Sequence, residues 1–479
     1  MRVCLVTPPS EFLLDQRVFL SLGILKVGAV LEQSGFQVDH LDLTGVENYE
    51  DAARDYDGCS TFAITATTPQ LPSAVRICKA LQSSDSHIIL GGPHPTLVNA
   101  AARRGSTRAK AALDYLLANF DCVVAGDGEK AIFQALGFYG LIDADDPKSQ
   151  LWQSSKDFND SPWPARHLVD LDSYHYTVDG KRALSMVSQL GCPFECGFCG
   201  GRFSPMLRRI RSRTADNVVA EMLSVHREYG IEGMMFYDDE LNVNKGIVPL
   251  MREIAATGID WRLRGFVKAE LFTEEQAEAM YAAGFRWLLC GFESAHPRIL
   301  KNINKKATLE QNTAMLRTAH KYGLKVKALM SIGHPGESEE TVYATRDWLL
   351  QEKPDDFDCT VITVYPGTPF YDSAVVVEPP VYRYEINGDA LYSEDVNFNE
   401  GVAYYKGKSG AYHSYVWTDY LTRERLVELR DQLEAEVRSK LGIPYQTGAA
   451  ALHFEHSMGQ NLPPYILRGS NGKPDNACT

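Results

Sequence analysis

The chain has 479 residues, of which 44% are hydrophobic and 23% are charged, as in a globular protein of more than one domain. Its formal net charge of −14 argues against a nucleic-acid partner, because proteins that bind nucleic acid present a basic face. We find no apolar run of the roughly 20 residues that span a bilayer and no secretory signal. We therefore expect a cytoplasmic protein without a membrane partner, whose cysteines stay reduced.

Strand-like and helix-like segments alternate over residues 1–140. This alternation predicts an α/β domain with a doubly wound, Rossmann-like parallel sheet. Ligands of such sheets bind at the carboxyl ends of the strands, and glycine-rich turns there let the backbone approach a phosphate or nucleotide closely. The candidate binding residues in these turns are Thr65, Gly91, Gly92, Gly126 and Gly128.

The rest of the chain divides into three further regions. Residues 141–182 have little regular pattern and contain three prolines, which predicts a linker. Six strand candidates alternate with helical segments over residues 183–372, which predicts a partial (β/α)6 barrel of the TIM type with its chemistry on the loops after the strands. Residues 373–479 are rich in tyrosine and acidic residues and include a helical stretch, so we expect a C-terminal α-rich cap over the substrate.

A cysteine cluster follows the first predicted barrel strand. Cys192, Cys196 and Cys199 lie in the loop sequence GCPFECGFCG, residues 191–200. Structural zinc usually takes four ligands, and the sequence offers no second pair of cysteines or histidines with suitable spacing. Simple burial of these cysteines does not suit a loop that contains Gly, Pro and Glu. Three thiolates on one loop can instead hold three irons of a four-iron cluster and leave the fourth iron open to a ligand.

This spacing, with Phe198 before the last cysteine, resembles the CxxxCxΦC motif of the radical S-adenosylmethionine (SAM) superfamily. The resemblance implies that the three cysteines hold a [4Fe-4S] cluster and that Phe198 lies beside the cofactors. It also implies that SAM binds the open iron and is cleaved there to a 5′-deoxyadenosyl radical. The protein is accordingly expected to be an enzyme.

The sequence FYDDELN, at the end of the second predicted barrel strand, supports the same resemblance. In similar proteins, polar or acidic residues at this place meet the amino group of SAM, which suggests Asp238, Asp239 and Glu240 as candidates for that contact. We also assign Tyr237 and Glu240 as candidate catalytic residues. The alternative is an acidic turn at the start of a helix, stabilised by the helix dipole.

Two later strand ends also resemble the family. In GFES, the resemblance places Glu293 and Ser294 beside the ribose or methionine part of SAM. A carboxylate accepts hydrogen bonds well from the hydroxyl and ammonium groups there. A structural ion pair is the alternative for Glu293. The GHPGE turn at residues 333–337 resembles another family turn, in which Gly336 also suits the turn itself.

The amino-terminal region resembles the radical SAM subgroup that has an N-terminal cobalamin-binding-like domain. The residues that carry this resemblance are TPP at 7–9, the helical segment 22–38, GGPH at 91–94 and GDGE at 126–129. The resemblance implies bound cobalamin. A DxHxxG motif, whose histidine would bind cobalt, is matched only by chance at His87, because the glycine comes one place late.

These patterns leave more than one function open. With cobalamin, we expect C-methylation of a small, natural-product-type substrate, with flavodoxin or ferredoxin as the reductant. Without cobalamin, the alternative is diol dehydration of a cationic aminosugar, as in aminoglycoside antibiotic biosynthesis. A ligand-binding sensor without catalysis is the third hypothesis. The aminosugar hypothesis uses the following acidic and aromatic residues: Glu385, Asp389, Glu394, Asp395, Glu400, Tyr382, Tyr384, Tyr392, Tyr404, Tyr405, Tyr412 and Tyr415.

Overall fold

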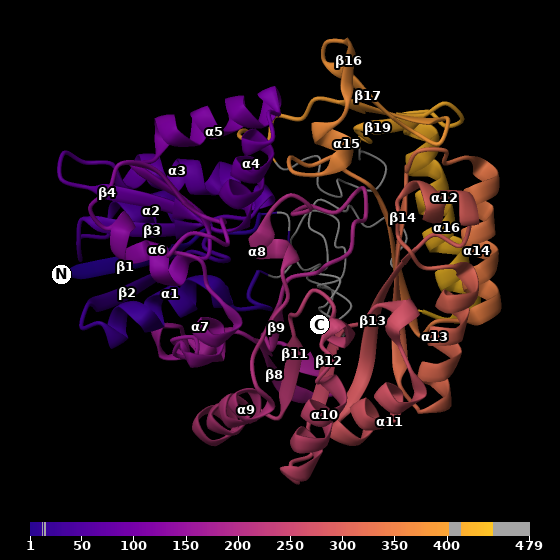
Figure 1. The fold of residues 1–479 in the computed structure, drawn as a ribbon, viewed down its shortest axis with the longest axis horizontal. Coiled ribbons are helices and arrows are strands. Elements are labelled where there is room, and N and C mark those ends of the chain that lie inside the picture. The colour runs from indigo at the N-terminus through magenta and orange to yellow at the C-terminus, as the bar shows by residue number, and fades with distance from the viewer. Residues whose placement is uncertain (12, 14–15, 402–412, 444–479) are drawn as a thin grey trace, which may run out of the picture.

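The computed structural model describes residues 1–11, 13, 16–401 and 413–443. Two parallel sheets lie side by side, the amino-terminal one at the left of Figure 1 and the other at the right. The first sheet has six strands in the order β2-β1-β3-β4-β5-β6, all paired in parallel. These strands are β1 (Arg2–Thr7), β2 (Gln37–Asp42), β3 (Thr61–Thr65), β4 (His87–Gly91), β5 (Cys122–Gly126) and β6 (Gly140–Ala144).

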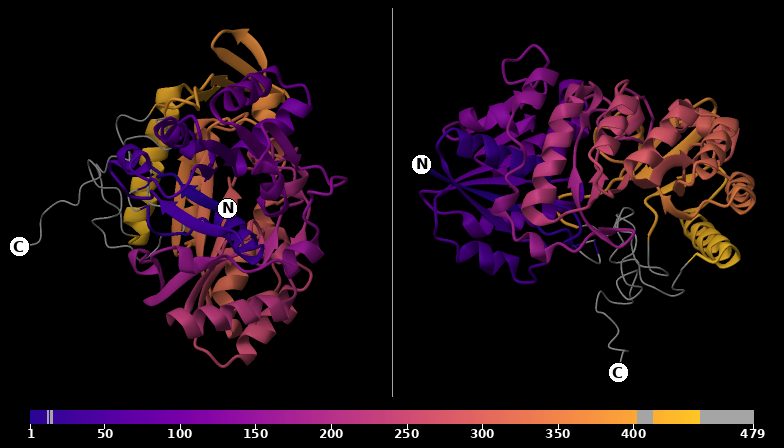
Figure 2. Two further views of the ribbon diagram at one scale, coloured as in Figure 1. Left: turned by 90° about the vertical axis from the view of Figure 1, so that its left-hand side faces the viewer. Right: turned by 90° about the horizontal axis from the view of Figure 1, so that it is seen from below.

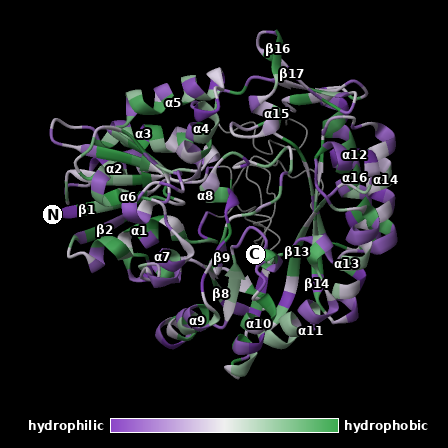
Figure 3. Cartoon of the chain, in the orientation of Figure 1, coloured by the Kyte–Doolittle hydropathy of each residue, from purple (hydrophilic) through white to green (hydrophobic). Residues whose placement is uncertain are grey.

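Helices cover both faces of this sheet, as the sequence predicted. Its central strands carry buried apolar residues that belong to two separate clusters, one on each face of the sheet. The hydrophobic strands accordingly lie between mixed helices in Figure 3. The α-helices described in this domain are α1 (Leu22–Gln33), α2 (Tyr49–Arg54), α3 (Leu71–Leu81), α4 (Pro93–Arg103), α5 (Thr107–Asn119) and α6 (Gly128–Ala135).

The expected limits of the linker need correction at both ends. The first sheet extends past residue 140, because Leu141 of β6 pairs with Val123 of β5. The predicted linker also contains a short helix, α7 (Ser155–Asp160), and the hairpin strand β7 (Thr177–Val178). Only the part between β6 and β7 therefore connects the two sheets.

The second sheet has six parallel strands, which confirms the expected partial barrel, and β7 adds an antiparallel edge. Its helices form an outer shell around the curved sheet (Figure 1). The parallel strands are β8 (Lys181–Met186), β11 (Gly233–Phe236), β12 (Arg262–Phe266), β13 (Phe285–Glu293), β14 (Lys325–Ile332) and β15 (Asp356–Val361). The shell helices are α9 (Ala215–Tyr229), α10 (Ile247–Ala256), α11 (Glu274–Ala283), α12 (Pro297–Asn302), α13 (Leu309–Lys321) and α14 (Glu339–Glu352).

The C-terminal region is not the α-rich cap that we expected. The short helix α15 (Pro369–Asp372) precedes this region, which forms a four-stranded antiparallel sheet beside α16 (Arg423–Leu441). A tight hairpin joins the second and third strands of this sheet, where Asn387 and Gly388 adopt positive φ angles of 53° and 84°, which Asn-Gly accepts readily. The strands of this sheet are β16 (Val375–Glu378), β17 (Val381–Ile386), β18 (Asp389–Glu394) and β19 (Val416–Thr418).

Buried polar contacts join the first domain to the segment that follows the cysteine loop. Arg211 in β10 (Arg211–Ser212) forms an ion pair with Asp127, and both side chains are buried. The two domains stay side by side in the right-hand view of Figure 2. Among the described residues, no helix has the length and apolar character needed to cross a membrane.

Candidate functional site

A cavity of about 770 Å³ lies at the carboxyl ends of the first sheet. Residues from strand ends β3, β4 and β5 form one side. The opposite side comes from the barrel, through Leu190 after β8, Gly200 in the cysteine loop, Met206, Tyr237 after β11 and Tyr365 after β15. The five predicted binding residues all line this cavity: Thr65, Gly91, Gly92, Gly126 and Gly128.

The glycines fit this surface for specific reasons. Gly92 has a φ of +102°, and a Cβ there would lie 2.8 Å from Thr65 Oγ1. Gly126 has a φ of +103°, and a Cβ there would meet the backbone of Ala144 at 2.5 Å. A Cβ at Gly91 would meet nothing within 4 Å. The absence of side chains in these turns therefore keeps the cavity wide and brings backbone to its surface.

Backbone hydrogen bonds attach the cysteine loop to neighbouring segments. Cys192 N donates to Leu207 O at 2.9 Å, and Gly197 N donates to Ile303 O at 2.8 Å. All three thiols are free. No three His, Cys, Asp or Glu side chains in the described part of the chain converge closely enough to hold one ion. This donor set, three thiols spread along one loop, fits a group wider than a single ion.

Burial and nearby charges change the pKa values of the cysteine thiols. Burial, with the neighbouring Glu240 and Asp239 carboxylates, raises the pKa of the Cys192 thiol to about 11. Burial also raises the pKa of Cys196, an effect that Lys305 and Lys268 oppose. Iron binds the thiolate form of cysteine, so binding of iron must displace the protons of these thiols.

The residues after β11 divide between structural and accessible positions. Asp238 is buried and accepts hydrogen bonds from Ser188 N, at 2.7 Å, and from the Ser188 hydroxyl, so it ties the end of β11 to the end of β8. Burial raises the pKa of Asp238 to about 7, although these hydrogen bonds act to lower it. Asp239 is exposed, close enough to Cys192 to raise the pKa of that thiol. Tyr237 is 38% exposed and lines the cavity, its ring edge-on to Phe19 at 5.4 Å.

Glu240 lies beneath the cysteine loop with an unmet hydrogen-bonding capacity. Its Oε2 is buried and finds no partner among the described residues. Burial raises the pKa of Glu240 to about 7, although Lys305 and Lys268 oppose the rise. A buried carboxylate of this kind is ready to accept a hydrogen bond from a bound ligand.

Glu293 and Ser294, which are adjacent in the chain, lie in different environments. Glu293 has a φ of 63°, which is rare for a residue with a side chain, and its carboxylate points into the barrel. It accepts hydrogen bonds from Ser331 Oγ at 2.7 Å and from Lys305 Nζ at 3.2 Å. Ser294 is 2% exposed and its hydroxyl contacts Thr345 Oγ1 at 3.3 Å. The structure therefore brings Glu293 to the cysteine site and gives Ser294 a packing role.

Comparisons with known proteins agree with this geometry. Residues 186–349 match the family model described as the radical SAM superfamily, and residues 17–136 match the model described as the B12 binding domain. The chain combines a B12-binding domain with a radical SAM domain. A radical SAM domain implies a [4Fe-4S] cluster and SAM, and a B12-binding domain implies cobalamin. The protein is thus an enzyme of the radical SAM class.

Similar proteins include several methyltransferases. An uncharacterized methyltransferase of Pyrococcus horikoshii is 29% identical over 404 residues, which cover 78% of this chain and 83% of the relative. A bacteriochlorophyllide d C-12(1)-methyltransferase of Chlorobaculum tepidum is 26% identical, over 77% of each chain. The solved structure of the radical SAM methyltransferase TsrM from Kitasatospora setae has the same fold, with a TM-score of 0.64, 18% identity, and coverage of 93% of this chain and 91% of that one.

Among the described residues, no histidine lines the cavity beside the B12-binding domain. His87 begins β4, at the end of the strand away from the cavity, and its Nε2 is 2.7 Å from Ala135 O. His94 is buried, with Nδ1 3.0 Å from Thr68 Oγ1, and burial lowers its pKa to about 4. The interpretation of His87 as a chance match to the cobalt-ligand motif is therefore consistent with its place in the fold.

Aromatic residues of the radical SAM domain pack behind the cysteine loop. The Phe198 ring lies 5.3 Å from the His334 ring, and Phe370 is 6.4 Å from the same histidine. A Cβ at Gly197 would meet the Phe370 ring at 2.8 Å. Phe198 thus supports the loop from its apolar side, and Gly197 allows the aromatic ring to approach.

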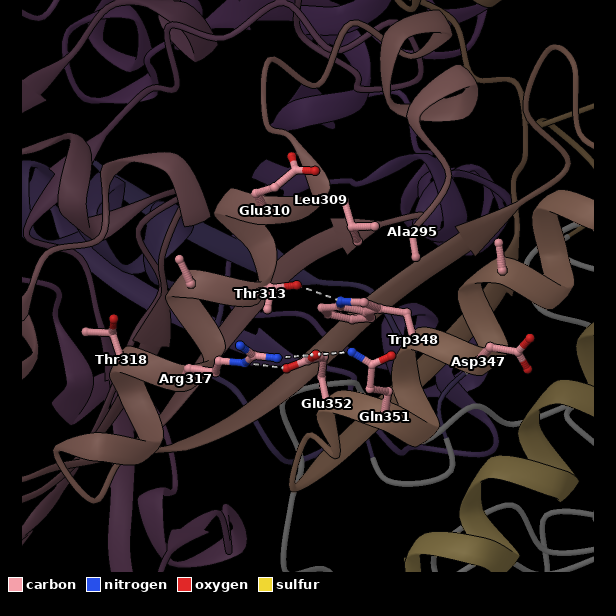
Figure 4. Close-up of a pocket in the computed structure, with 12 residues that line it drawn as sticks. Ala295, Leu309, Glu310, Thr313, Arg317, Thr318, Asp347, Trp348, Gln351 and Glu352 are labelled. Carbon is pink, nitrogen blue, oxygen red and sulfur yellow. Dashed lines mark hydrogen bonds and ion pairs between the residues drawn. The ribbon is translucent and has the colours of Figure 1, made fainter.

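Sequence patterns missed the buried Lys268, which follows β12, and the buried Lys305, which follows α12, and both lie at the cysteine site. They lie in no recognised motif, and only burial of a charged residue marks them. Another hollow, between α13 and α14, lies on the outside of the barrel (Figure 4). Its polar side chains already pair with each other, as Arg317 does with Glu352 at 2.8 Å and Trp348 Nε1 with Thr313 Oγ1 at 2.9 Å. The residues that line this hollow are not among the predicted site residues, so it lies apart from the predicted chemistry.

Proposed function

We propose that this enzyme transfers a methyl group to an unactivated carbon atom of a small molecule and depends on cobalamin for the transfer. The observation that carries the proposal is the cavity of about 770 Å³ that the B12-binding domain and the cysteine loop line together. A cofactor on the first sheet would there face the cysteine site directly. The methyltransferases among the relatives support the same reaction class.

The bound cofactors would supply hydrogen-atom abstraction through SAM cleavage and a methyl group through cobalamin. The side chains of the protein hold these groups and orient the substrate between them. Cys192, Cys196 and Cys199 would hold the cluster. Glu240 and Glu293 provide carboxylates at the same site for the ammonium or hydroxyl groups of SAM.

Tyr237 and Tyr365 line the part of the cavity that the barrel contributes. Because they follow β11 and β15, we expect them to lie between the two predicted cofactors. Each presents a flat apolar ring and a hydroxyl, which suits a substrate with both apolar and polar parts. We expect Tyr237 to contact the substrate, and a low-potential donor such as flavodoxin or ferredoxin to supply electrons.

The aminosugar hypothesis receives no support from the acidic C-terminal region. That hypothesis needs carboxylates that are free to bind ammonium groups, but four of them form ion pairs with arginines within the protein. Tyr404, Tyr405 and Tyr412 lie outside the described residues. The pairs are Glu385–Arg383, Asp389–Arg298, Glu394–Arg423 and Asp395–Arg108.

Anaerobic reconstitution followed by two measurements tests the proposal. The reconstituted protein, incubated with hydroxocobalamin and desalted, should keep about one equivalent of cobalamin by its visible spectrum. With SAM and dithionite, it should release 5′-deoxyadenosine. Release without retained cobalamin would overturn the methylation proposal, and the absence of release would contradict the radical reaction itself.

A further inference from the structure

Two buried lysines lie beneath the cysteine loop and belong to no recognised motif. Lys268, after β12, is 2% exposed, and Lys305, after α12, is 6% exposed. A buried ammonium group is costly unless it is paired. Lys268 Nζ is 2.7 Å from Glu270 Oε1, and it donates to the backbone oxygen of Lys305 at 3.0 Å. The Lys268 charge is therefore matched by a carboxylate of its own segment.

The loop that carries Lys305 is fastened to the cysteine loop. Ile303 O accepts a hydrogen bond from Gly197 N, and Asn304 Nδ2 donates to Glu195 O at 2.7 Å. The residues on either side of Lys305 are in the left-handed region, with φ angles of 54° at Asn304 and 65° at Lys306. Such angles are uncommon outside glycine and persist where the surroundings impose them. The loop thus adopts an unusual backbone path that inserts the Lys305 side chain into the barrel.

Lys305 pairs with the carboxylate of Glu293, which a second hydrogen bond also holds in place. Its Nζ donates to Glu293 Oε1 at 3.2 Å, while Ser331 Oγ donates to Glu293 Oε2 at 2.7 Å. A Cβ at Gly291 would lie 2.6 Å from Glu293 Oε1 and 3.0 Å from Lys305 Nζ. The pair therefore passes directly over Gly291, and a larger residue at that position would displace it.

The same lysine lies in a loop that is bonded on both sides of Cys196. Asn304 Nδ2 donates to Glu195 O, Gly197 N donates to Ile303 O, and both Cys196 and Lys305 are buried. Because water is excluded from this region, charges there interact strongly. A cation beside the thiolates stabilises any additional negative charge that arrives at the metal site.

We propose that Lys305 is a positioning residue that holds the Glu293 carboxylate and supplies the positive charge that makes the cysteine-bound cluster easier to reduce. This inference rests on the proposed function. The redox step is a one-electron reduction of the cluster by an external titrant such as dithionite, which is itself oxidised. No covalent bond forms or breaks in this step, and the reduced cluster carries one more negative charge.

A redox titration of the reconstituted cluster, followed by electron paramagnetic resonance, tests this role without turnover. Lys305→Met should shift the midpoint potential to more negative values, because it removes a positive charge. Glu293→Gln should shift it to more positive values, because it leaves the lysine charge uncompensated. Lys305→Arg should stay close to wild type. Lys301→Met, which neutralises an exposed lysine on α12, serves as the matched control.

The opposite signs distinguish this inference from general damage to the fold. The double variant Lys305→Met/Glu293→Gln should return toward the wild-type potential, since both members of the pair are removed. Unchanged potentials in both single variants, or shifts of the same sign, would overturn the proposal. If Lys305→Met does not bind iron, the Glu293→Gln variant alone tests the proposal: a shift to more positive potential supports it, and no shift or a negative shift overturns it. A wild-type protein that binds no cluster would instead contradict the proposed function.

Discussion

Asp145, at the end of the first sheet, accepts a 2.8 Å hydrogen bond from the hydroxyl of Ser204, which follows the cysteine loop. The same carboxylate oxygen accepts from Met206 N at 2.7 Å, while Arg103 donates to the other oxygen at 2.7 Å. Asp145 is fully buried. The B12-binding domain thereby fixes where the chain leaves the cysteine loop, so the two predicted cofactor sites are held in one relative position.

This contact should contribute measurably to stability. Ser204→Ala removes a hydrogen bond to a buried carboxylate, and we expect the free energy of unfolding to fall by about 1.5–3 kcal/mol. Chemical denaturation followed by circular dichroism measures the change. Ser224→Ala, whose hydroxyl bonds the exposed Glu228, is the matched control and should change stability by less than about 0.5 kcal/mol. Equal effects in both variants would contradict the role of Asp145 in holding the domains together.

Iron content should depend on the three loop cysteines. Replacement of Cys192, Cys196 or Cys199 by serine removes one thiolate ligand, and the anaerobically reconstituted protein should lose most of its iron, from about four irons per chain. Iron and sulfide assays measure this. Cys59→Ser, which alters a free thiol in the first domain, should keep the full content. Full iron binding without Cys196 would disprove the assignment of the ligands.

A side chain at Gly91 should prevent cobalamin binding. The site of its Cβ is open space beside the cavity, so Gly91→Phe should leave the backbone unstrained and project into the volume that the cofactor needs. We expect at least a tenfold loss of affinity for hydroxocobalamin in a spectroscopic titration. Gly137→Phe, which also has open space but lies outside the cavity, should bind as the wild type does. Normal binding by Gly91→Phe would place the cofactor elsewhere.

His87 should not act as a cobalt ligand. Its ring bonds the Ala135 carbonyl, so His87→Ala should lower stability by about 1 kcal/mol but leave the visible spectrum of bound cobalamin unchanged. Spectra of both proteins, loaded under identical conditions, test this. A spectrum that changes on replacement of His87 would show that the histidine reaches the metal.

Asp389 should make stability depend on pH in the acidic range. Its hydrogen bond from Arg298, and a second from Asn302, hold the pKa of this carboxyl below its ordinary value. A depressed pKa stabilises the folded protein above the ordinary pKa of about 3.9, and this contribution is lost as the pH falls through the lower, folded-state value. Asp389→Asn should therefore reduce stability at pH 7, by about 1.5–3 kcal/mol.

The difference between wild type and Asp389→Asn should shrink in the acidic range. Denaturant midpoints of both proteins, measured from pH 7 down to the acid limit of folding, provide the comparison. Asp172, which is exposed and pairs with Arg182, gives the control Asp172→Asn. A difference that stays constant with pH would show that the Asp389 carboxylate is not the origin of the effect.

The sequence by itself determined the features that depend on neighbouring residues. Alternating apolar patterns sufficed for both parallel sheets, because each strand and helix follows its own periodicity. The cysteine loop could be recognised because Cys192, Cys196 and Cys199 lie within eight residues of one another. The glycine turns at Gly92 and Gly126 could likewise be predicted from short-range requirements of the backbone.

Tertiary structure alone decided how distant charges pair. Lys305, in the loop after α12, reaches Glu293 at the end of β13, and no local pattern encodes that contact. The acidic C-terminal residues looked available for a ligand, but the fold brings arginines from other segments to Asp389 and Asp395. The physical reason is that a buried charge must find its counter-ion wherever the fold provides one, and that partner can lie far away in the sequence.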